Sequence, residues 1–289
     1  MKALLSLTAG LALLVAAPYA VQAQISTPQP SPKASVMQRV GLTDVTVTYS
    51  RPSAKGRAIF GTLVPFGKRW RTGANATTTI KFSDDVTVEG KKVPAGEYGI
   101  YTIPNKTEWL VVLNKDLKRG ADVDNFKDDQ DVARFTVKPY TLPKKVETFT
   151  IAFTDLTPAT ASVDLMWETT GAKFKVVSDV EPKVMAQIDE KVVKNAAPAS
   201  NDLAAAAVYY LDNNKDLNQA LTWIKKANEK EPKFWNLHTQ AKIEMKLKDY
   251  KAANATAEQS RKLALDAKNA DYVKMNEDLM ASAKKDGKL

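Results

Sequence analysis

The chain has 289 residues, and its composition of 44% hydrophobic and 26% charged side chains is typical of folded globular domains. It contains no cysteine and a single histidine, His238, so disulfide bonds, thiolate chemistry and cysteine metal sites are excluded, and most histidine-dependent triads and metal centres are disfavoured. The formal net charge of +9 favours an anionic ligand or partner.

Residues 1–23 are typical of a secretory signal peptide. Lys2 provides a charged start, an apolar run over 3–20 follows, and small residues at the −3 and −1 positions precede Gln24. No later stop-transfer segment and no cysteine for a lipid anchor are found. We therefore expect a signal peptide over 1–23 and a periplasmic or secreted mature chain without a transmembrane segment, for which nucleic acid is not a partner.

Residues 24–32 are rich in Pro and Ser and predict a flexible, extended lead-in. From Lys33 onward the sequence indicates short strands, with a hairpin turn at Glu89-Gly90-Lys91 between 86–88 and 92–93. No helical pattern interrupts them, which predicts an all-β antiparallel sandwich over 33–180. The other predicted strands are 45–50, 77–82, 98–103, 108–113, 133–137, 146–153, 161–167 and 174–177.

After residue 180 the apolar period changes from two to about 3.6 residues, which predicts helices. We expect a helical linker over 181–200 and an all-α module over 201–284, and we expect His238 to be an ordinary, partly exposed helix residue. The second helix should be capped by Ser200 or Asn201. The predicted helices start at Glu181 and then cover 200–210, 217–230, 234–246, 249–266 and 270–284.

The helical half resembles tetratricopeptide repeats. Ala220, Ile224, Ala227 and Pro232 follow the family rhythm A-x3-[FI]-x2-A-x4-P, and Tyr250, Ala253 and Ala257 begin a second unit about 33 residues on. Both units lack the Trp-Leu-Gly signature in the first helix, so divergent repeats and merely repeat-like helices both stay open. The resemblance implies a concave, protein-docking face.

Six basic residues and no acidic residue lie between Arg51 and Arg71, where they alternate with aromatic residues. Arginine forks and flat aromatic faces suit the recognition of an anion or a sugar. This pattern predicts a ligand site for an anionic or glycan ligand. Its candidate residues are Arg51, Arg57, Trp70, Arg71 and Asn75.

The same segment also permits a structural interpretation. In that alternative the arginines stack on Trp70 or Tyr49 and pair with Asp84, Asp85 or Glu97 across the fold. The two interpretations make different predictions for Trp70, which is either exposed in a cleft or buried.

The sequence YSRP…KGR…IFG…LVP.G..WRTGAN..T, together with the later FSDDV…GKKVPAGEYG, resembles the bacterial exported family of domain of unknown function 2911. The resemblance covers about 33–180, and such proteins often carry repeat-like helices behind this domain. It implies export and a β domain, and it transfers no catalytic residue.

Catalysis has weak support in the sequence. A glycosidase needs two carboxylates that face each other across its substrate, whereas the adjacent Asp84 and Asp85 should diverge. We therefore expect a non-catalytic envelope protein, without a metal or cofactor, that binds or scaffolds an envelope protein partner through its helical module. The alternatives are a small-ligand or glycan-binding protein and, with less support, a glycan or peptide hydrolase that uses Asp85 or Glu97.

Overall fold

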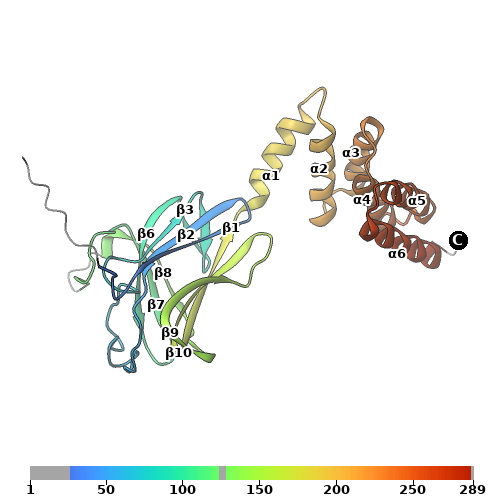
Figure 1. The fold of residues 1–289 in the computed structure, drawn as a ribbon. Coiled ribbons are helices and arrows are strands. Elements are labelled where there is room, and N and C mark those ends of the chain that lie inside the picture. The colour runs from blue at the N-terminus through green and yellow to red at the C-terminus, as the bar shows by residue number, and fades with distance from the viewer. Residues whose placement is uncertain (1–26, 124–127, 288–289) are drawn as a thin grey trace, which may run out of the picture.

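The computed structural model describes residues 27–123 and 128–287, so the predicted signal peptide and part of the lead-in lie outside the described residues. Two antiparallel sheets form the first part of the chain, and a group of helices forms the second (Figure 1). The predicted fold class, a β domain followed by a helical module, is confirmed.

The two sheets pack face to face, and their inward side chains form one hydrophobic core. The four-stranded sheet has the order β5 (Lys91–Val93), β4 (Val86–Val88), β10 (Thr160–Ser178) and β9 (Tyr140–Thr154). The six-stranded sheet has the order β1 (Lys33–Val40), β2 (Thr43–Ser50), β3 (Thr79–Phe82), β6 (Gly96–Pro104), β7 (Trp109–Asn114) and β8 (Asp131–Val137).

Residue alternation explains which face each strand buries. In β2, Val45, Val47 and Tyr49 point into the core, while Thr46 and Thr48 lie on the outer face. A two-residue turn joins β4 to β5, and both of its residues, Glu89 and Gly90, have positive φ of 44° and 77°. A turn with positive φ at both central residues matches the right-handed twist of the two strands that it joins. The predicted hairpin is therefore confirmed.

The strands predicted at 161–167 and 174–177 are one strand, β10. Its register against β9 shifts between Met166 and Glu168 and again between Glu168 and Thr170. Because of these bulges the buried positions change from odd numbers, such as Trp167, to even numbers, such as Phe174. The change of phase breaks the alternation, and this is why the sequence pattern indicates two strands.

The described part of the helical module contains α1 to α6. Asp216 and Asp249 cap α3 and α5 by accepting hydrogen bonds from backbone N–H groups. The cap predicted for α2 at Ser200 or Asn201 is wrong, because Ala199 takes that position and makes no side-chain bond. The helices are α1 (Val180–Ile188), which continues into a π-helical turn (Asp189–Val193), α2 (Ser200–Asp212), α3 (Leu217–Lys230), α4 (Phe234–Lys246), α5 (Tyr250–Asp266) and α6 (Ala270–Gly287).

Helix α1 joins the two parts of the molecule. Lys183 of α1 forms an ion pair with Asp84, in the turn between β3 and β4, at 2.6 Å. Glu181, at the start of the same helix, pairs with Lys215 in the turn that precedes α3. The connection is therefore held from both sides. Within residues 27–123 and 128–287, no helix has the length and apolar character needed to cross a membrane.

A buried polar network links three helices of the module. His238 of α4 is only 7% exposed, so the expectation of a partly exposed residue is wrong. Its Nδ1 lies 2.9 Å from Oδ1 of Asn276 in α6, and Nδ2 of Asn276 donates to Ser260 Oγ in α5 at 2.8 Å. The histidine is therefore an interior residue that holds helices together.

We expect the helical module to lose stability as the pH falls below about 6.5. Burial lowers the pKa of His238 below its ordinary value of 6.5, against a smaller opposing effect of the hydrogen bond to Asn276. Between the pKa of His238 in the unfolded chain and its lower pKa in the folded chain, the unfolded chain binds more protons. The stability that neutral His238 contributes is therefore fully present above about pH 6.5 and is lost as the pH falls towards the pKa of the folded chain. Urea unfolding followed by circular dichroism between about pH 7.5 and pH 5 measures it.

The matched control is His238→Gln, which cannot titrate in this range. Its urea midpoint should depend less on pH than that of the wild-type protein. Equal pH dependence in the two proteins would contradict the assignment to His238.

Candidate functional site

Trp70, the central residue of the predicted ligand site, lies inside the sandwich. Its ring stacks on Trp167 with centroids 5.9 Å apart and an interplanar angle of 20°, and it meets Phe149 at 5.2 Å. Its indole Nε1 donates to the carbonyl oxygen of Gly73 at 3.0 Å. Trp70 is only 9% exposed, so the ring is not available to the anionic or glycan ligand that the sequence pattern predicts.

Two of the arginines bind the protein's own oxygen atoms. Arg51 donates from Nε to the carbonyl oxygen of Phe149 at 3.2 Å and from Nη2 to Thr150 Oγ1 at 2.8 Å. Arg57 donates to the carbonyl oxygens of Ala54 and Ser53, at 2.9 and 2.7 Å. These contacts hold the long loop after β2 onto β9 and close its first turn.

Arg71 and Asn75 differ from the other candidates. Arg71 is half-buried, burial lowers its pKa, and its Nε has no hydrogen-bond partner among residues 27–123 and 128–287. Among the described residues it forms no ion pair. Asn75 is exposed with φ of 56° and donates to the carbonyl oxygen of Ser31 at 3.1 Å. Since Trp70 is internal and Arg57 and Asn75 are exposed, the five candidates do not converge on one open pocket.

Asp84 and Asp85, two of the three carboxylates named for the structural and hydrolase alternatives, have other partners. Asp84 pairs with Lys183, and Asp85 Oδ1 accepts from the backbone N–H of Ala95 at 2.8 Å. The expected pairing of these two aspartates with the loop arginines is therefore wrong. Lys183 and Ser83 hold the pKa of Asp84 below its usual range. Within the described ranges, no group of three or more acidic or histidine side chains could hold a metal ion.

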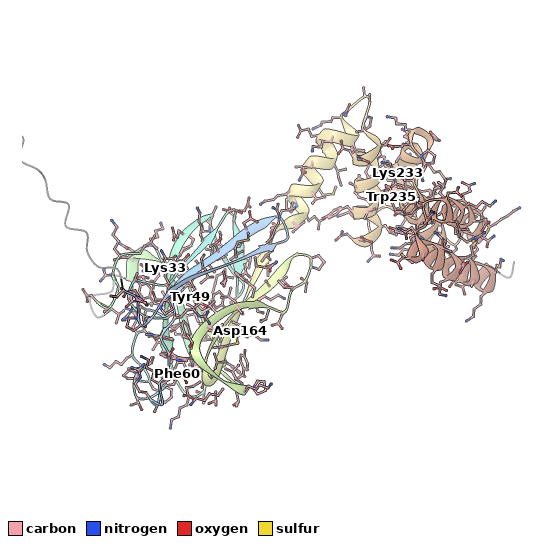
Figure 2. All side chains as sticks on the ribbon, in the orientation of Figure 1. Lys33, Tyr49, Phe60, Asp164, Lys233 and Trp235 are labelled. Atoms are coloured by element: carbon pink, nitrogen blue, oxygen red, sulfur yellow. The ribbon has the colours of Figure 1, made fainter. Side chains whose placement is uncertain are left out.

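A buried carboxylate lies on the four-stranded sheet, at Asp164 of β10 (Figure 2). It is 4% exposed, and Tyr140 OH donates to its Oδ2 at 2.5 Å. Burial raises the pKa of Asp164 and also that of Tyr140. Gly171 stands opposite Tyr140 in the register, where a Cβ atom would collide with the Tyr140 ring. We interpret this pair as part of the packing of the β9–β10 hairpin.

A groove of about 770 Å³ opens between the β domain and α2, and we call it the interdomain groove. Its walls are mostly apolar and include Val184 of α1 and the exposed Val208 of α2. Such an open apolar hollow is typical of a surface that receives another molecule. The lining residues are Pro158, Ala159, Ser178, Asp179, Val180, Glu181, Val184, Ala205, Val208, Tyr209, Asp212 and Asn213.

Acidic side chains surround the apolar walls of the interdomain groove. Glu181 pairs with Lys215, whereas Asp179 and Asp212 form no ion pair with a described residue. Burial raises the pKa of Tyr209 in the wall, and the charge of Glu181 adds to this effect. The groove therefore combines apolar contact with negative charge.

Large apolar side chains are also exposed along the helical module. Val208, Trp235 and Met275 are 38, 43 and 43% exposed and belong to α2, α4 and α6. The ammonium group of Lys233 lies over the Trp235 ring, 5.4 Å from its centroid, and both residues are labelled on the helical module in Figure 2. Helix α2 begins at position 200 and α4 at 234, while α3 begins at 217 and α5 at 250. Equivalent helices of successive pairs are therefore offset by 34 (200 to 234) and 33 (217 to 250) residues.

Sequence reasoning missed the interdomain groove. Its walls come from the β9–β10 turn, α1 and α2, which are separate segments of the chain that only the fold brings together. The sequence holds one local signal for it, Val208 in a helix otherwise rich in alanine.

Comparison with known proteins gives one family. A family model described as "Protein of unknown function (DUF2911)" matches residues 31–176, which is just over half of the chain. Neither a curated protein nor a solved structure matches.

Proposed function

This chain belongs to the DUF2911 family, and we propose that it is an exported, non-catalytic binding protein that docks a protein segment in its interdomain groove. The observation that carries the proposal is the groove itself, in which Val184, Val208 and Tyr209 form apolar walls beside Asp179 and Asp212. A segment with apolar and basic side chains matches both properties. The repeat-like helical spacing supports the same role, because such arrays commonly present docking surfaces.

Selection from a random peptide display library tests the docking role, because it does not require the natural partner. The enriched peptides should combine apolar residues with Lys or Arg. Val208→Asp should weaken their binding by about tenfold or more, because it places a charge in the apolar wall. Asp212→Asn should weaken it less and should reduce its dependence on salt.

The matched control is Val193→Asp, which makes the same substitution at a valine that is 61% exposed and lies outside the interdomain groove. This variant should bind the peptides like the wild-type protein. Enrichment of acidic peptides, or equal loss in the two variants, would contradict docking in this groove.

Export is a separate part of the proposal and rests on the sequence over 1–23. Mass spectrometry of the protein purified from its native envelope should find a mature chain that starts at Gln24. A chain that retains the segment 1–23 and stays in the cytoplasm would contradict it.

The small-ligand alternative is favoured by one observation, the half-buried guanidinium of Arg71, whose Nε has no hydrogen-bond partner in the described part of the chain. A carboxylated or phosphorylated ligand would satisfy this group. Arg71→Met should then abolish the binding of such a ligand, measured by calorimetry with sugar phosphates and sugar acids.

A further inference from the structure

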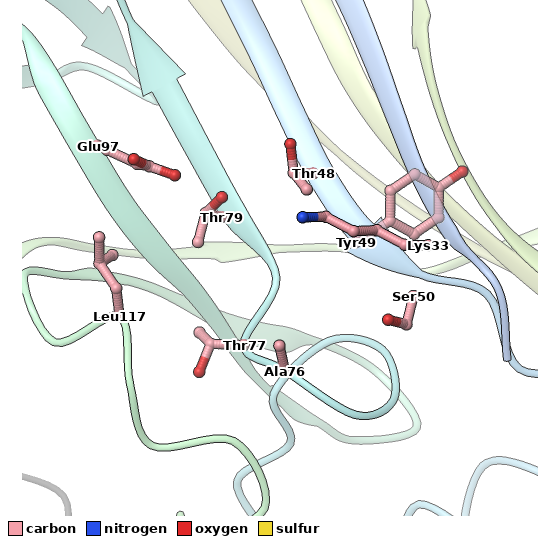
Figure 3. Close-up of a pocket in the computed structure, with 9 residues that line it drawn as sticks. All are labelled: Lys33, Thr48, Tyr49, Ser50, Ala76, Thr77, Thr79, Glu97 and Leu117. Carbon is pink, nitrogen blue, oxygen red and sulfur yellow. The ribbon is translucent and has the colours of Figure 1, made fainter. Parts of the chain in front are cut away.

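A second hollow, of about 320 Å³, lies on the outer face of the six-stranded sheet, and we call it the strand groove (Figure 3). Thr48 of β2 and Thr79 of β3 form its floor, where they are direct partners in the antiparallel register. The loops that follow β2 and β7 form its side. The lining residues are Lys33, Thr48, Tyr49, Ser50, Ala76, Thr77, Thr79, Glu97 and Leu117.

The strand order places one charge on each side of this floor. Lys33 lies on edge strand β1 and is paired with Ser50, whereas Glu97 lies on β6, beyond β3. Three strand spacings of about 4.8 Å separate β1 from β6, so their backbones are roughly 14 Å apart. Figure 3 shows the amino group of Lys33 and the carboxylate of Glu97 both extending towards Thr79.

Both charges are available to a ligand. Lys33 and Glu97 are exposed, and neither forms an ion pair or side-chain hydrogen bond with a described residue. Lys81 stands opposite Glu97 in the register, yet no ion pair joins the two side chains. Ala76 and Leu117 add an apolar wall next to the threonine hydroxyl groups.

We propose that the strand groove binds a small zwitterion, with the ligand carboxylate at Lys33 and the ligand ammonium group at Glu97. A simple anion would be attracted by Lys33 but repelled by the carboxylate of Glu97. A simple cation would be attracted by Glu97 but repelled by Lys33. Only a ligand with both groups satisfies both ends, while its polar centre lies over Thr48 and Thr79. Free amino acids and short peptides with free ends share this chemistry. This site is independent of the interdomain groove.

Calorimetry with five compounds tests the proposal on the purified protein. Alanine, dialanine and trialanine carry both charges at increasing separation, N-acetyl-dialanine lacks the ammonium group, and dialanine amide lacks the carboxylate. At least one free-ended compound should bind, and both blocked compounds should bind about tenfold more weakly than dialanine or not at all. The order of the three free-ended compounds distinguishes an amino acid from a peptide ligand.

Two variants assign the two ends. Glu97→Gln should weaken the binding of dialanine about tenfold. It should not weaken any residual binding of N-acetyl-dialanine and should strengthen it if it changes it, because that anion has no ammonium group and meets the charge of Glu97 in the wild-type protein. Lys33→Met should likewise weaken the binding of dialanine about tenfold. It should not weaken any residual binding of dialanine amide, because that compound has no carboxylate. Glu108→Gln and Lys91→Met change exposed residues outside the strand groove and serve as matched controls.

Amide chemical shifts give a second measurement that does not depend on a variant. Binding should move the resonances of Thr48 and Thr79 more than those of α2. The proposal is overturned when no free-ended compound binds at about 10 mM, when blocked and free-ended compounds bind equally, or when the two variants change nothing.

Discussion

Trp70→Ala is expected to lower the free energy of unfolding of the β domain by about 3–5 kcal/mol. The ring lies between Trp167 of β10 and Phe149 of β9 and also contacts Phe60, with centroids 6.1 Å apart. Truncation leaves a cavity bordered by β9, β10 and Phe60, which lies in the loop after β2. It also removes the hydrogen bond from Nε1 to Gly73, which leaves that carbonyl oxygen without this donor.

The backbone contacts of residue 70 should survive the substitution. Trp70 and Thr102 exchange two backbone hydrogen bonds, of 2.7 and 2.9 Å, that need no side chain. The lower free energy of unfolding therefore comes from the lost packing of the ring and from the lost hydrogen bond of the indole N–H. Trp70→Phe keeps an aromatic ring and loses the N–H donor, so it should lie between alanine and the wild-type protein.

Thermal and urea unfolding followed by far-UV circular dichroism measure the effect. A loss of this size should lower the Tm of the β domain by roughly 6–20 °C. The matched control is Trp235→Ala, since Trp235 is 43% exposed and truncation should cost less than about 1 kcal/mol.

The result also decides between the two interpretations of the 51–75 segment. A Trp70→Ala protein that is as stable as the wild type but no longer responds to an anionic or glycan ligand would return Trp70 to a binding role. Strong destabilisation assigns the residue to the architecture of the loop.

Local patterns were sufficient to predict most elements of the fold. The hairpin turn at Glu89 and Gly90 could be predicted because Gly90 accepts positive φ between two short apolar runs, and α3 and α4 have the predicted bounds. The prediction failed at β10, because two bulges around Glu168 change the phase of burial within one strand. A period-two pattern contains no signal for such a shift.

The candidate sites were harder to predict because they depend on distant parts of the chain. Trp70 is surrounded by cations in the sequence, and its burial follows only from Phe149 and Trp167, which belong to the last two strands of the β domain. Lys33 and Glu97 likewise line the same groove only because β3 pairs with β6. Neither residue has a local motif that would indicate the other.

The second large effect is expected in the helical module, where Asn276→Leu should lower the free energy of unfolding by about 2–4 kcal/mol. Asn276 is fully buried in α6. Its Nδ2 donates to Ser260 Oγ at 2.8 Å and to the carbonyl oxygen of Tyr272 at 2.7 Å. Because a carbonyl oxygen only accepts, the orientation of the amide is fixed, and Oδ1 must accept from Nδ1–H of His238.

Leucine has a similar volume but makes none of these bonds. His238 Nδ1–H then stays buried without a partner, whereas Ser260 Oγ keeps its bond to the carbonyl oxygen of Phe234 at 2.6 Å. The cost is thus that of a broken network rather than of a cavity. Helix α6 should separate from α4 and α5 at lower temperature, while the β domain keeps its Tm.

Hydrogen exchange followed by mass spectrometry resolves this difference, because peptides from α6 should exchange faster and those from β6 and β7 should not. Asn218→Leu makes the same substitution at an exposed position of α3 and should change little. Unchanged protection of α6 in Asn276→Leu would show that apolar packing alone holds the helix. Helix α6 belongs to the helical module, whereas the residues that line the strand groove all belong to the β domain. Asn276→Leu should therefore leave the binding of free-ended compounds in the strand groove unchanged. This variant is thus a further test that the two parts of the molecule act separately.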